Sequence, residues 1–228
     1  FNQMTEDLGR YLEDKVQRQK DLNETKLKLY QTQLNPHFLY NTLDTIKWEA
    51  RIRQMPRIAV LAENLAVILR KSISSKLFIP LKEELETIDS YVEVQEIRFT
   101  GRFLCEKEIP DQLEECLVPK MILQPLVENA ILHGLEGCEN GYICIYAGRE
   151  GDVLNISITD NGCGMSPEIL AWINSPEPEK RDGHLGLYNI MRILKLYYGN
   201  EYGLKAEVTE DGTTVTLSLP VRMEGDDV

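Results

Sequence analysis

The chain has 228 residues, of which 43% are hydrophobic and 27% charged, and its 37 acidic against 25 basic residues give a net charge of -12. This composition is typical of a soluble globular protein with one large domain or two small ones. The acidic balance repels a phosphate backbone, so we expect no nucleic-acid partner.

Five scattered cysteines without a CxxC pair indicate buried free thiols in a reducing compartment rather than disulfides or a zinc site; they are Cys105, Cys116, Cys138, Cys144 and Cys163. No uncharged apolar run approaches the roughly 20 residues that a membrane helix needs. Because the chain begins with Phe1, we expect it to be a fragment of a longer protein.

Residues 1–34 are polar with a narrow apolar stripe, which predicts a long helix in a two-stranded coiled coil. Pro36 either kinks this helix or lies in the first turn of a new one capped by Asn35. A second apolar stripe follows, then a turn at 53–56 and a helix at about 57–74. Two helices joined by a short turn form an antiparallel hairpin that cannot cover its own apolar face, so two copies would make a four-helix bundle.

After Pro80 the pattern changes to mixed helices and strands. We expect helices at about 81–98, 119–134 and 186–198, and strands near 102–109, 141–149, 152–160, 203–209 and 213–219. The alternation in "YICIYAGR" and "LNISITD" is typical of half-buried antiparallel strands. These elements predict an α+β sandwich with helices on one face of the sheet. The predicted organisation is a signalling coil at 1–29, a dimerising hairpin at 30–76, an α+β domain at 80–221 and a tail at 222–228.

The segment "ILQPLVENAILHGLE" (122–136) places Asn129 and His133 four residues apart, on one face of an expected helix. Polar side chains on an apolar helix need partners, and the backbone alone could supply them. "DNGCGM" (160–165) then sets Asp160 at the end of an apolar strand beside Gly162 and Gly164.

The third segment, "GHLGLYN" (183–189), opens a helix whose N–H groups favour phosphate, and it contains Gly183, Gly186 and Leu187. Each of these motifs is weak alone. The three in this order within one α+β domain indicate a nucleotide site.

In these motifs the sequence resembles the ATP-binding (Bergerat-type) fold shared by histidine kinases, gyrase and MutL, the GHKL superfamily. The resemblance implies that Asn129 holds Mg²⁺ against the phosphates of ATP, with His133 nearby, and that Asp160 reads the adenine amino group. It also implies that residues 165–185 form a mobile lid. Lys180 and Arg181 on that lid would contact phosphate or form a solvated charge pair.

One departure from the superfamily concerns hydrolysis. Its ATP-hydrolysing members carry a glutamate base four residues before the asparagine, where this chain has Pro125. An absent base cannot activate water, which favours phosphoryl transfer to another acceptor. Glu128, about 100° round an α-helix from Asn129, is a poor substitute.

"LNPHFLYNTLDTI" supplies that acceptor in His37, because a neutral imidazole is nucleophilic and the first turn of a helix stabilises added negative charge. The stretch resembles the phosphoacceptor motif of LytS/YesM-type sensor histidine kinases. "LKEELETIDSYVEVQEIRF", "QPLVENAILHG" and "HLGLYNIMRILKLYYG" continue the resemblance, which covers about residues 30–220.

The resemblance implies a homodimer that phosphorylates His37 from Mg-ATP and passes the phosphoryl group to an aspartate of a response regulator. It also implies that this is the cytoplasmic portion of a membrane receptor, with "FNQMTEDL" resembling the end of a HAMP segment. Whether transfer runs within one chain or across the dimer stays open.

Better-known histidine kinases place an acidic residue directly after the acceptor, where this chain has Phe38. Asn41, one helical turn on, is a candidate for orienting water in dephosphorylation. The alternatives are a GHKL ATPase, a serine kinase of the anti-sigma type, and an inactive dimeric scaffold.

Overall fold

The computed structural model describes residues 36–99, 101–176, 178–181, 183–223 and 225. The expected coil at 1–29, its HAMP-like start and the first residues of the hairpin lie outside this range. The described α-helices are α2 (Pro36–Ile52), α3 (Pro56–Ile73), α4 (Leu81–Phe99), α5 (Gln124–Asn129), α6 (Pro167–Ile173) and α7 (Leu185–Tyr198). None of these helices combines the length and the apolar character needed to cross a bilayer.

Helices α2 and α3 form the expected antiparallel hairpin, joined by a turn in which Gln54 has φ 56°. Small buried side chains let the two helices approach closely: Ala50, Ala59, Ala62 and Ala66. The Tyr40 hydroxyl donates to the carbonyl of Leu69 across the pair (3.3 Å). The hairpin therefore has its own small apolar seam.

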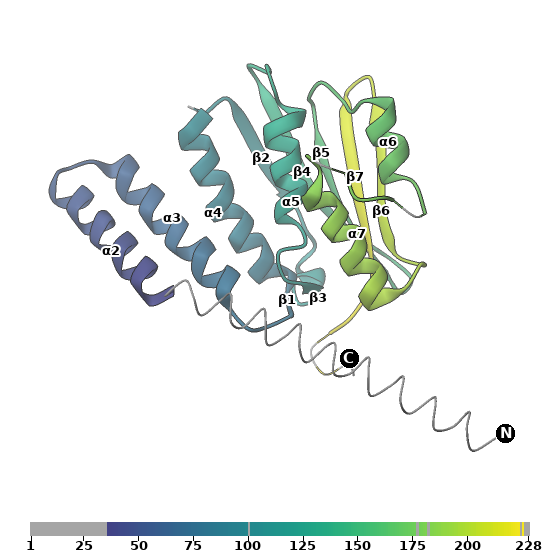
Figure 1. Cartoon of the computed structure of the whole chain (residues 1–228), viewed down its shortest axis with the longest axis horizontal. Coiled ribbons are helices and arrows are strands. Elements are labelled where there is room, and N and C mark those ends of the chain that lie inside the picture. Colours follow the sequence, from purple (N-terminus) through teal and green to yellow (C-terminus); the bar gives the residue numbers. More distant parts are fainter. Residues whose placement is uncertain (1–35, 100, 177, 182, 224, 226–228) are drawn as a thin grey trace.

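Helix α3 also packs against α4, so the hairpin and the C-terminal half share a layer of helices (Figure 1). Asn64 of α3, which is buried, donates to Glu93 of α4 at 2.6 Å. Part of the face expected to await a second copy is thus covered within the chain. Large apolar side chains remain exposed on α2, α3 and their turn: Phe38, Ile46, Trp48, Ile52, Met55, Ile58 and Leu65.

A five-stranded sheet forms the centre of the C-terminal half, in the order β2 (Phe103–Glu108), β4 (Gly141–Glu150), β5 (Val153–Asp160), β7 (Gly212–Pro220) and β6 (Gly203–Thr209). All neighbours are antiparallel except β2 and β4, which run parallel. The parallel pair is possible because a long crossover that contains α5 connects the two strands.

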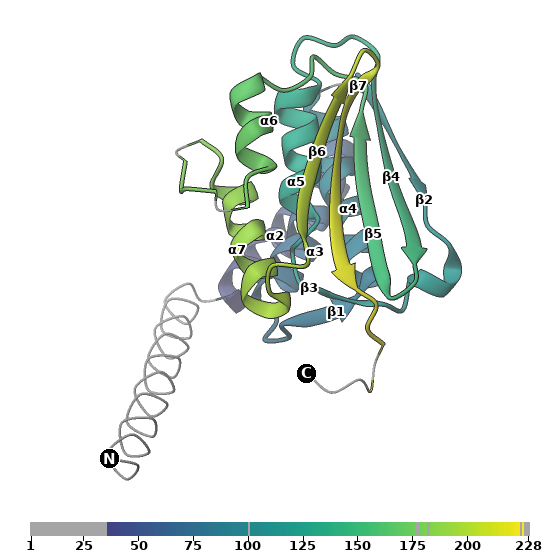
Figure 2. The same ribbon diagram turned by 90° about the vertical axis from the view of Figure 1, so that its right-hand side faces the viewer.

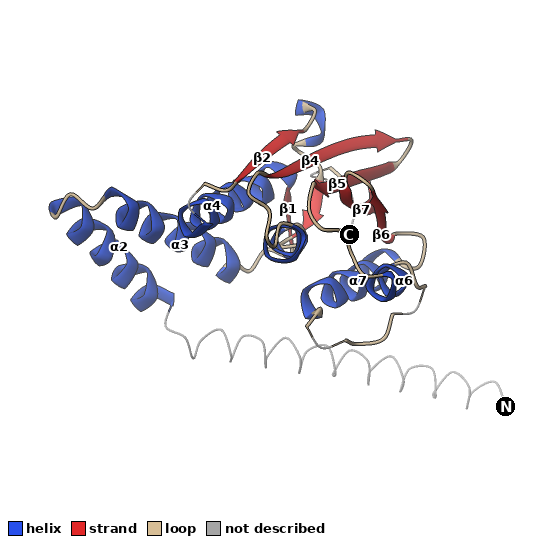
Figure 3. Cartoon of the chain, turned by 90° about the horizontal axis from the view of Figure 1, so that it is seen from above, coloured by secondary structure: helices blue, strands red, loops and turns tan. Residues whose placement is uncertain are grey.

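Helices α4, α5, α6 and α7 lie on one face of the sheet, and no described α-helix covers the other (Figures 2 and 3). The short 3₁₀ helix η1 (Asp111–Leu113) contacts β4. The strands alternate accordingly, and Ile143, Ile145, Leu154 and Ile156 are fully buried under the helices. This confirms the predicted α+β class with helices on one face.

The helix expected at 119–134 is much shorter. Leu117–Pro119 forms strand β3 and pairs with β1 (Phe78–Pro80), and Met121 takes a left-handed conformation with φ 60°. Helix α5 begins at Gln124 and passes after Asn129 into a π-helical segment, η2 (Ala130–Gly134). Continuous apolar periodicity across 119–134 concealed both changes.

Candidate functional site

Asn129 and His133 line a hollow of about 140 Å³ between α5–η2 and the start of α7, called here the α5–α7 hollow. The α5–η2 side also contributes Pro125, Glu128 and Leu132, and the α7 side contributes Gly183, His184, Gly186 and Leu187. Two of the three predicted motifs therefore meet. From an α-helix we expected Glu128 to point away from Asn129, but it is exposed and lines the same hollow.

The π-helical turn η2 brings Gly134 into close contact with Asp160 and with Gly162. A π-helical turn shifts the following residues relative to an α-helix, and such turns are frequent at functional sites. It carries Gly134 against Asp160: a Cβ on Gly134 would lie 2.7 Å from the Asp160 Cγ atom. A Cβ on Gly162 would lie 1.9 Å from the Gly134 oxygen, so both positions require glycine because of close approach.

Asp160 ends β5 and is only 3% exposed. Its Oδ1 atom accepts a hydrogen bond from the Gly162 N–H at 3.0 Å. Burial raises the pKa of the Asp160 carboxyl, and the Gly162 N–H lowers it. The motif "DNGCGM", which contains Asp160, thus lies behind Gly134 rather than in the wall of the α5–α7 hollow.

Thr213 is a polar residue that sequence reasoning missed. It lies opposite Asp160 in the β5–β7 register, is 1% exposed, and its Oγ1 atom has no hydrogen-bond partner among the described residues. A buried hydroxyl without a partner costs free energy that a ligand can recover. Its signal is the threonine pair at the start of the last strand, but only the register links it to Asp160.

His184 is a second residue that the sequence analysis left unassigned, although it lies inside "GHLGLYN". Its ring centroid is 6.2 Å from that of His133 and 6.0 Å from that of Trp172. Burial lowers the pKa of His184, and the nearby His133 and Arg181 lower it further. Two imidazoles therefore line the hollow, His133 on its α5–η2 side and His184 on its α7 side.

The expected lid, residues 165–185, contains α6 and the loop after it. Trp172 donates its Nε1–H to the Glu179 carbonyl at 2.7 Å, which ties the loop to α6. Arg181 pairs with Glu168 at 3.2 Å, as the solvated-charge reading has it, and Lys180 is exposed. Gly164 and Gly183 have φ of 82° and 86°, a conformation that glycine adopts readily at each end of the segment.

The residue types at this site suit a nucleotide with its metal: amide and imidazole groups, glycine-opened backbone and a buried acid–hydroxyl pair. The α5–α7 hollow is smaller than the ~300–1,000 Å³ of typical ligand pockets. A larger hollow of about 630 Å³ lies between the lid loop, α7 and β6, and neither Asn129 nor Asp160 lines it. As it stands, the α5–α7 hollow is too small for a whole nucleotide.

His37 lies in the first turn of α2 with an exposed ring. The Asn41 Nδ2 atom is 3.3 Å from its Nδ1 atom. Helices α3 and α4 separate α2 from the elements of the hollow (Figure 1). The structure thus brings Asn41 to His37 but does not bring His37 to the α5–α7 hollow.

The five cysteines are free thiols of different exposure. Cys116 is buried, whereas Cys163 is exposed. The expectation of uniformly buried thiols is therefore wrong for Cys163, because the glycine turn around it leaves the strand for the surface.

Comparisons with known proteins agree with this geometry. Residues 25–103 match the family described as histidine kinase, and residues 117–223 match the family of histidine kinase-, DNA gyrase B- and HSP90-like ATPases. The sensor histidine kinase YesM of Bacillus subtilis is 36% identical over 98% of the chain. BtsS of Escherichia coli, also a sensor histidine kinase, is 33% identical over 93% of it.

The chain belongs to the sensor histidine kinase family. It spans 38% of the length of YesM and 36% of BtsS, so it corresponds to little more than a third of either kinase. A solved histidine kinase domain from Erythrobacter litoralis is 15% identical with a TM-score of 0.51, and the match covers 82% of this chain and 94% of that one. This shows that the kinase fold extends through most of the chain.

Proposed function

We propose that this chain is the phosphoacceptor and catalytic portion of a sensor histidine kinase. It binds Mg-ATP between α5–η2 and α7, transfers the γ-phosphoryl group to His37, and passes it to an aspartate of a response regulator. The observation that carries the proposal is the α5–α7 hollow, where Asn129 and His133 face the glycine-opened start of α7.

The residues around the hollow divide the nucleotide among them. The Asn129 amide oxygen would hold Mg²⁺, and His133 and the N–H groups at Gly183 and Gly186 would bind phosphate. Leu187 would support the base. Asp160 and Thr213 would recognise the adenine amino group, with Gly162 and Gly164 allowing the ring to approach the backbone.

Phosphoryl transfer forms a P–N bond to a nitrogen of His37 as the bond between the γ-phosphorus and the ADP oxygen breaks. Bound Mg²⁺ would neutralise charge on the phosphates, and positioning supplies most of the remaining catalysis. The attacking nitrogen needs a free lone pair, so the ring proton must reside on the other nitrogen. Asn41 is suited to fix this tautomer: its amide nitrogen lies 3.3 Å from Nδ1 and 3.5 Å from Nε2, and with the amide group turned its oxygen would accept Nδ1–H and leave Nε2 to react.

The dimer is part of the same proposal. The exposed apolar side chains of α2 and α3, among them Trp48 at 59% and Ile52 at 75%, form a face that a second copy would cover as a four-helix bundle. The parent receptor would be anchored in a membrane, and the coil at 1–29 would carry its signal to the cytoplasmic hairpin at 30–76.

Hydrolysis is the rival activity that one observation favours. Pro125 occupies the position of the usual base, but Glu128 lines the α5–α7 hollow with an exposed carboxylate. In the His37→Gln protein we expect no sustained ATP turnover. Rapid turnover that Glu128→Gln removes would favour an ATPase instead.

The direct test is incubation of the protein with γ-labelled ATP and Mg²⁺. We expect an acid-labile label that is absent from His37→Gln and from Asn129→Ala, while both variants retain the wild-type melting temperature within a few degrees. Label that persists in His37→Gln would contradict the assignment of the acceptor.

A further inference from the structure

Glu84 of α4 is an acidic side chain in an apolar interior, with only 1% of its surface exposed. Its two carboxylate oxygens accept the N–H groups of Met121 (2.9 Å) and Leu123 (3.0 Å). These residues belong to the 120–123 corner, the four residues between β3 and α5. Glu84 therefore contacts the start of the helix that carries Asn129.

The start of α5 needs such an acceptor. The first N–H groups of a helix have no partner within the helix, and no local side chain caps α5. Glu84 supplies the cap from a different helix. A carboxylate beside the positive end of the α5 dipole is a favourable arrangement. Glu84 also holds Met121 in the left-handed conformation, which non-glycine residues rarely adopt.

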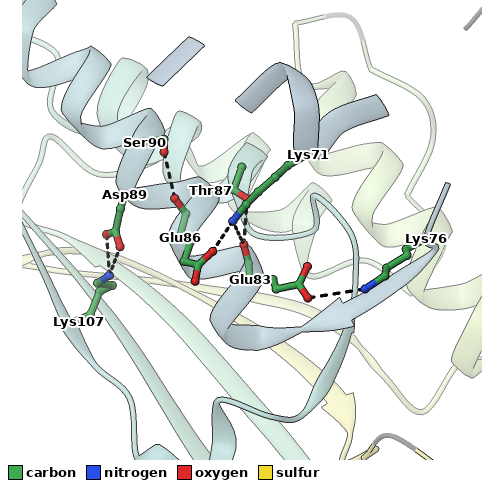
Figure 4. A network of polar contacts seen from close by, with 8 residues as sticks. All are labelled: Lys71, Lys76, Glu83, Glu86, Thr87, Asp89, Ser90 and Lys107. Atoms are coloured by element: carbon green, nitrogen blue, oxygen red, sulfur yellow. Dashed lines mark hydrogen bonds and ion pairs between the residues drawn. The ribbon is translucent and has the colours of Figure 1, made fainter. Parts of the chain in front are cut away.

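Lysines around the corner balance the buried charge and connect it to α3. Burial raises the pKa of the Glu84 carboxyl, while the N–H donors of the corner and the charge of Lys71 lower it. Lys71 of α3 donates to the Glu83 carbonyl (2.9 Å) and to Glu86 (2.7 Å), as Figure 4 shows. Lys120, in the corner itself, donates to the carbonyls of Ser72 and Ser74 at the end of α3.

Asn129 lies between two fixed points of one short segment. Glu84 holds the beginning of α5, six residues or about 9 Å before Asn129 along the helix. The close contact of Gly134 with Gly162 holds the end of η2. The apolar side of the segment packs in the core, and these two attachments fix its ends.

We propose that Glu84 is a positioning residue that sets Asn129 at the metal-bearing side of the nucleotide site. The inference rests on the proposed function and adds to it a residue outside the three nucleotide motifs. Glu84 touches no reacting atom and acts through the 120–123 corner alone.

The test compares Glu84→Gln with wild type by calorimetric titration with ADP, once with Mg²⁺ and once with EDTA. The amide keeps the shape of the carboxylate but turns a donor toward one of the two N–H groups. We expect the Mg²⁺-dependent gain in affinity to fall about tenfold, as for loss of one hydrogen bond to a charged group, while metal-free binding changes less than about twofold. The matched control is Asp89→Asn, an exposed acid on the same helix that pairs with Lys107 away from the corner, which we expect to leave both affinities unchanged.

A double-mutant cycle with Asn129→Ala separates positioning from general loosening. In the Asn129→Ala protein, Glu84→Gln should cause no further loss of Mg²⁺-dependent affinity, because the residue it positions is gone. If Glu84→Gln does not fold, Glu84→Asp, which can reach only one of the two N–H groups, takes its place with the same expected pattern.

Equal loss of metal-free and Mg²⁺-dependent binding, additive effects in the cycle, or failure of both variants to fold would each overturn the inference and leave Glu84 with a structural role. A wild-type protein that binds ADP with a Mg²⁺-dependent gain supports the proposed function in every one of these cases. A wild-type protein that binds no adenine nucleotide would overturn the proposed function itself.

Discussion

The proposed binding role of Asp160 comes at a cost in the stability of the folded protein. Its carboxyl is buried beside the unpartnered Thr213 hydroxyl, and burial raises its pKa. A group with a raised pKa in the folded state contributes stability below its unfolded value, and this stability is lost as the pH rises through the folded value. At pH values above the ordinary pKa of an aspartate, Asp160 therefore lowers the stability of the nucleotide-free protein.

Replacing Asp160 by Asn should consequently stabilise the nucleotide-free protein at pH 7. The amide oxygen can still accept the Gly162 N–H, and the cost of burying a charge disappears. We expect the melting temperature to rise by about 2–4 °C, which corresponds to about 1 kcal/mol for a chain of this size. The same variant should show no further rise with ADP, unlike wild type; a lower melting temperature without ligand would contradict the argument.

A second prediction concerns Asn41 and the tautomer of the His37 ring. If its amide fixes the tautomer of His37, Asn41→Ala should slow autophosphorylation about five- to tenfold, the effect of about 1 kcal/mol in the transition state. Asn41→Asp, whose carboxylate also accepts Nδ1–H, should retain most of the rate. Initial rates of labelling measure this, and an unchanged Asn41→Ala rate would leave only the suggested role in dephosphorylation.

Among the elements, those predicted well from the sequence are amphipathic and fold on their own pattern. Helices α3, α4 and α7 and strands β4 to β7 begin and end within a few residues of their predicted bounds. The prediction of one helix at 119–134 was wrong because tertiary contacts set both of its ends. Glu84, far away in sequence, fixes the start of α5, and contact with Asp160 and Gly162 fixes the end of η2. Asn129, His133 and the glycines could be identified from motifs. Thr213 is found only through the register of β5 with β7, and Glu84 only through its hydrogen bonds to the 120–123 corner.

The π-helical segment η2 has no room for a side chain at Gly134. Ala at position 134 would place a methyl group 2.7 Å from the Asp160 Cγ atom, so the segment or the acid must move. We expect Gly134→Ala to lower the free energy of unfolding by about 1–3 kcal/mol, as overpacking does, and to weaken ADP binding. Gly203→Ala, where an added Cβ meets nothing within 4 Å, is the control in urea titrations and should change stability by less than about 0.5 kcal/mol.

For the molecule as a whole, the decisive feature is the docking of α3 on α4. Asn64 binds Glu93, Lys71 binds Glu86, and Arg57 donates to the Ile97 carbonyl, so polar contacts run along the whole interface. In this arrangement α3 and α4 stand between His37 and the α5–α7 hollow of the same chain. The proposed phosphorylation of His37 would thus need either release of this interface or the nucleotide of a second chain.

Weakening the interface should therefore raise kinase activity if release limits the reaction. We expect the double variant Asn64→Ala/Lys71→Met to autophosphorylate about two- to tenfold faster, since each lost contact is worth about 1 kcal/mol or less. Arg53→Met, which removes the exposed pair with Glu49 outside this interface, is the control. A slower double variant with an unchanged ADP affinity would show that docking promotes transfer.

The shared layer of helices has one more implication, which concerns where the protein can be cut. Ile68 of α3 packs against the hydrophobic core of the C-terminal half. A proteolytic fragment that starts at residue 80 would keep every nucleotide motif but would lose the packing of Ile68 against its hydrophobic core. A stable fragment of the C-terminal half should accordingly keep α3.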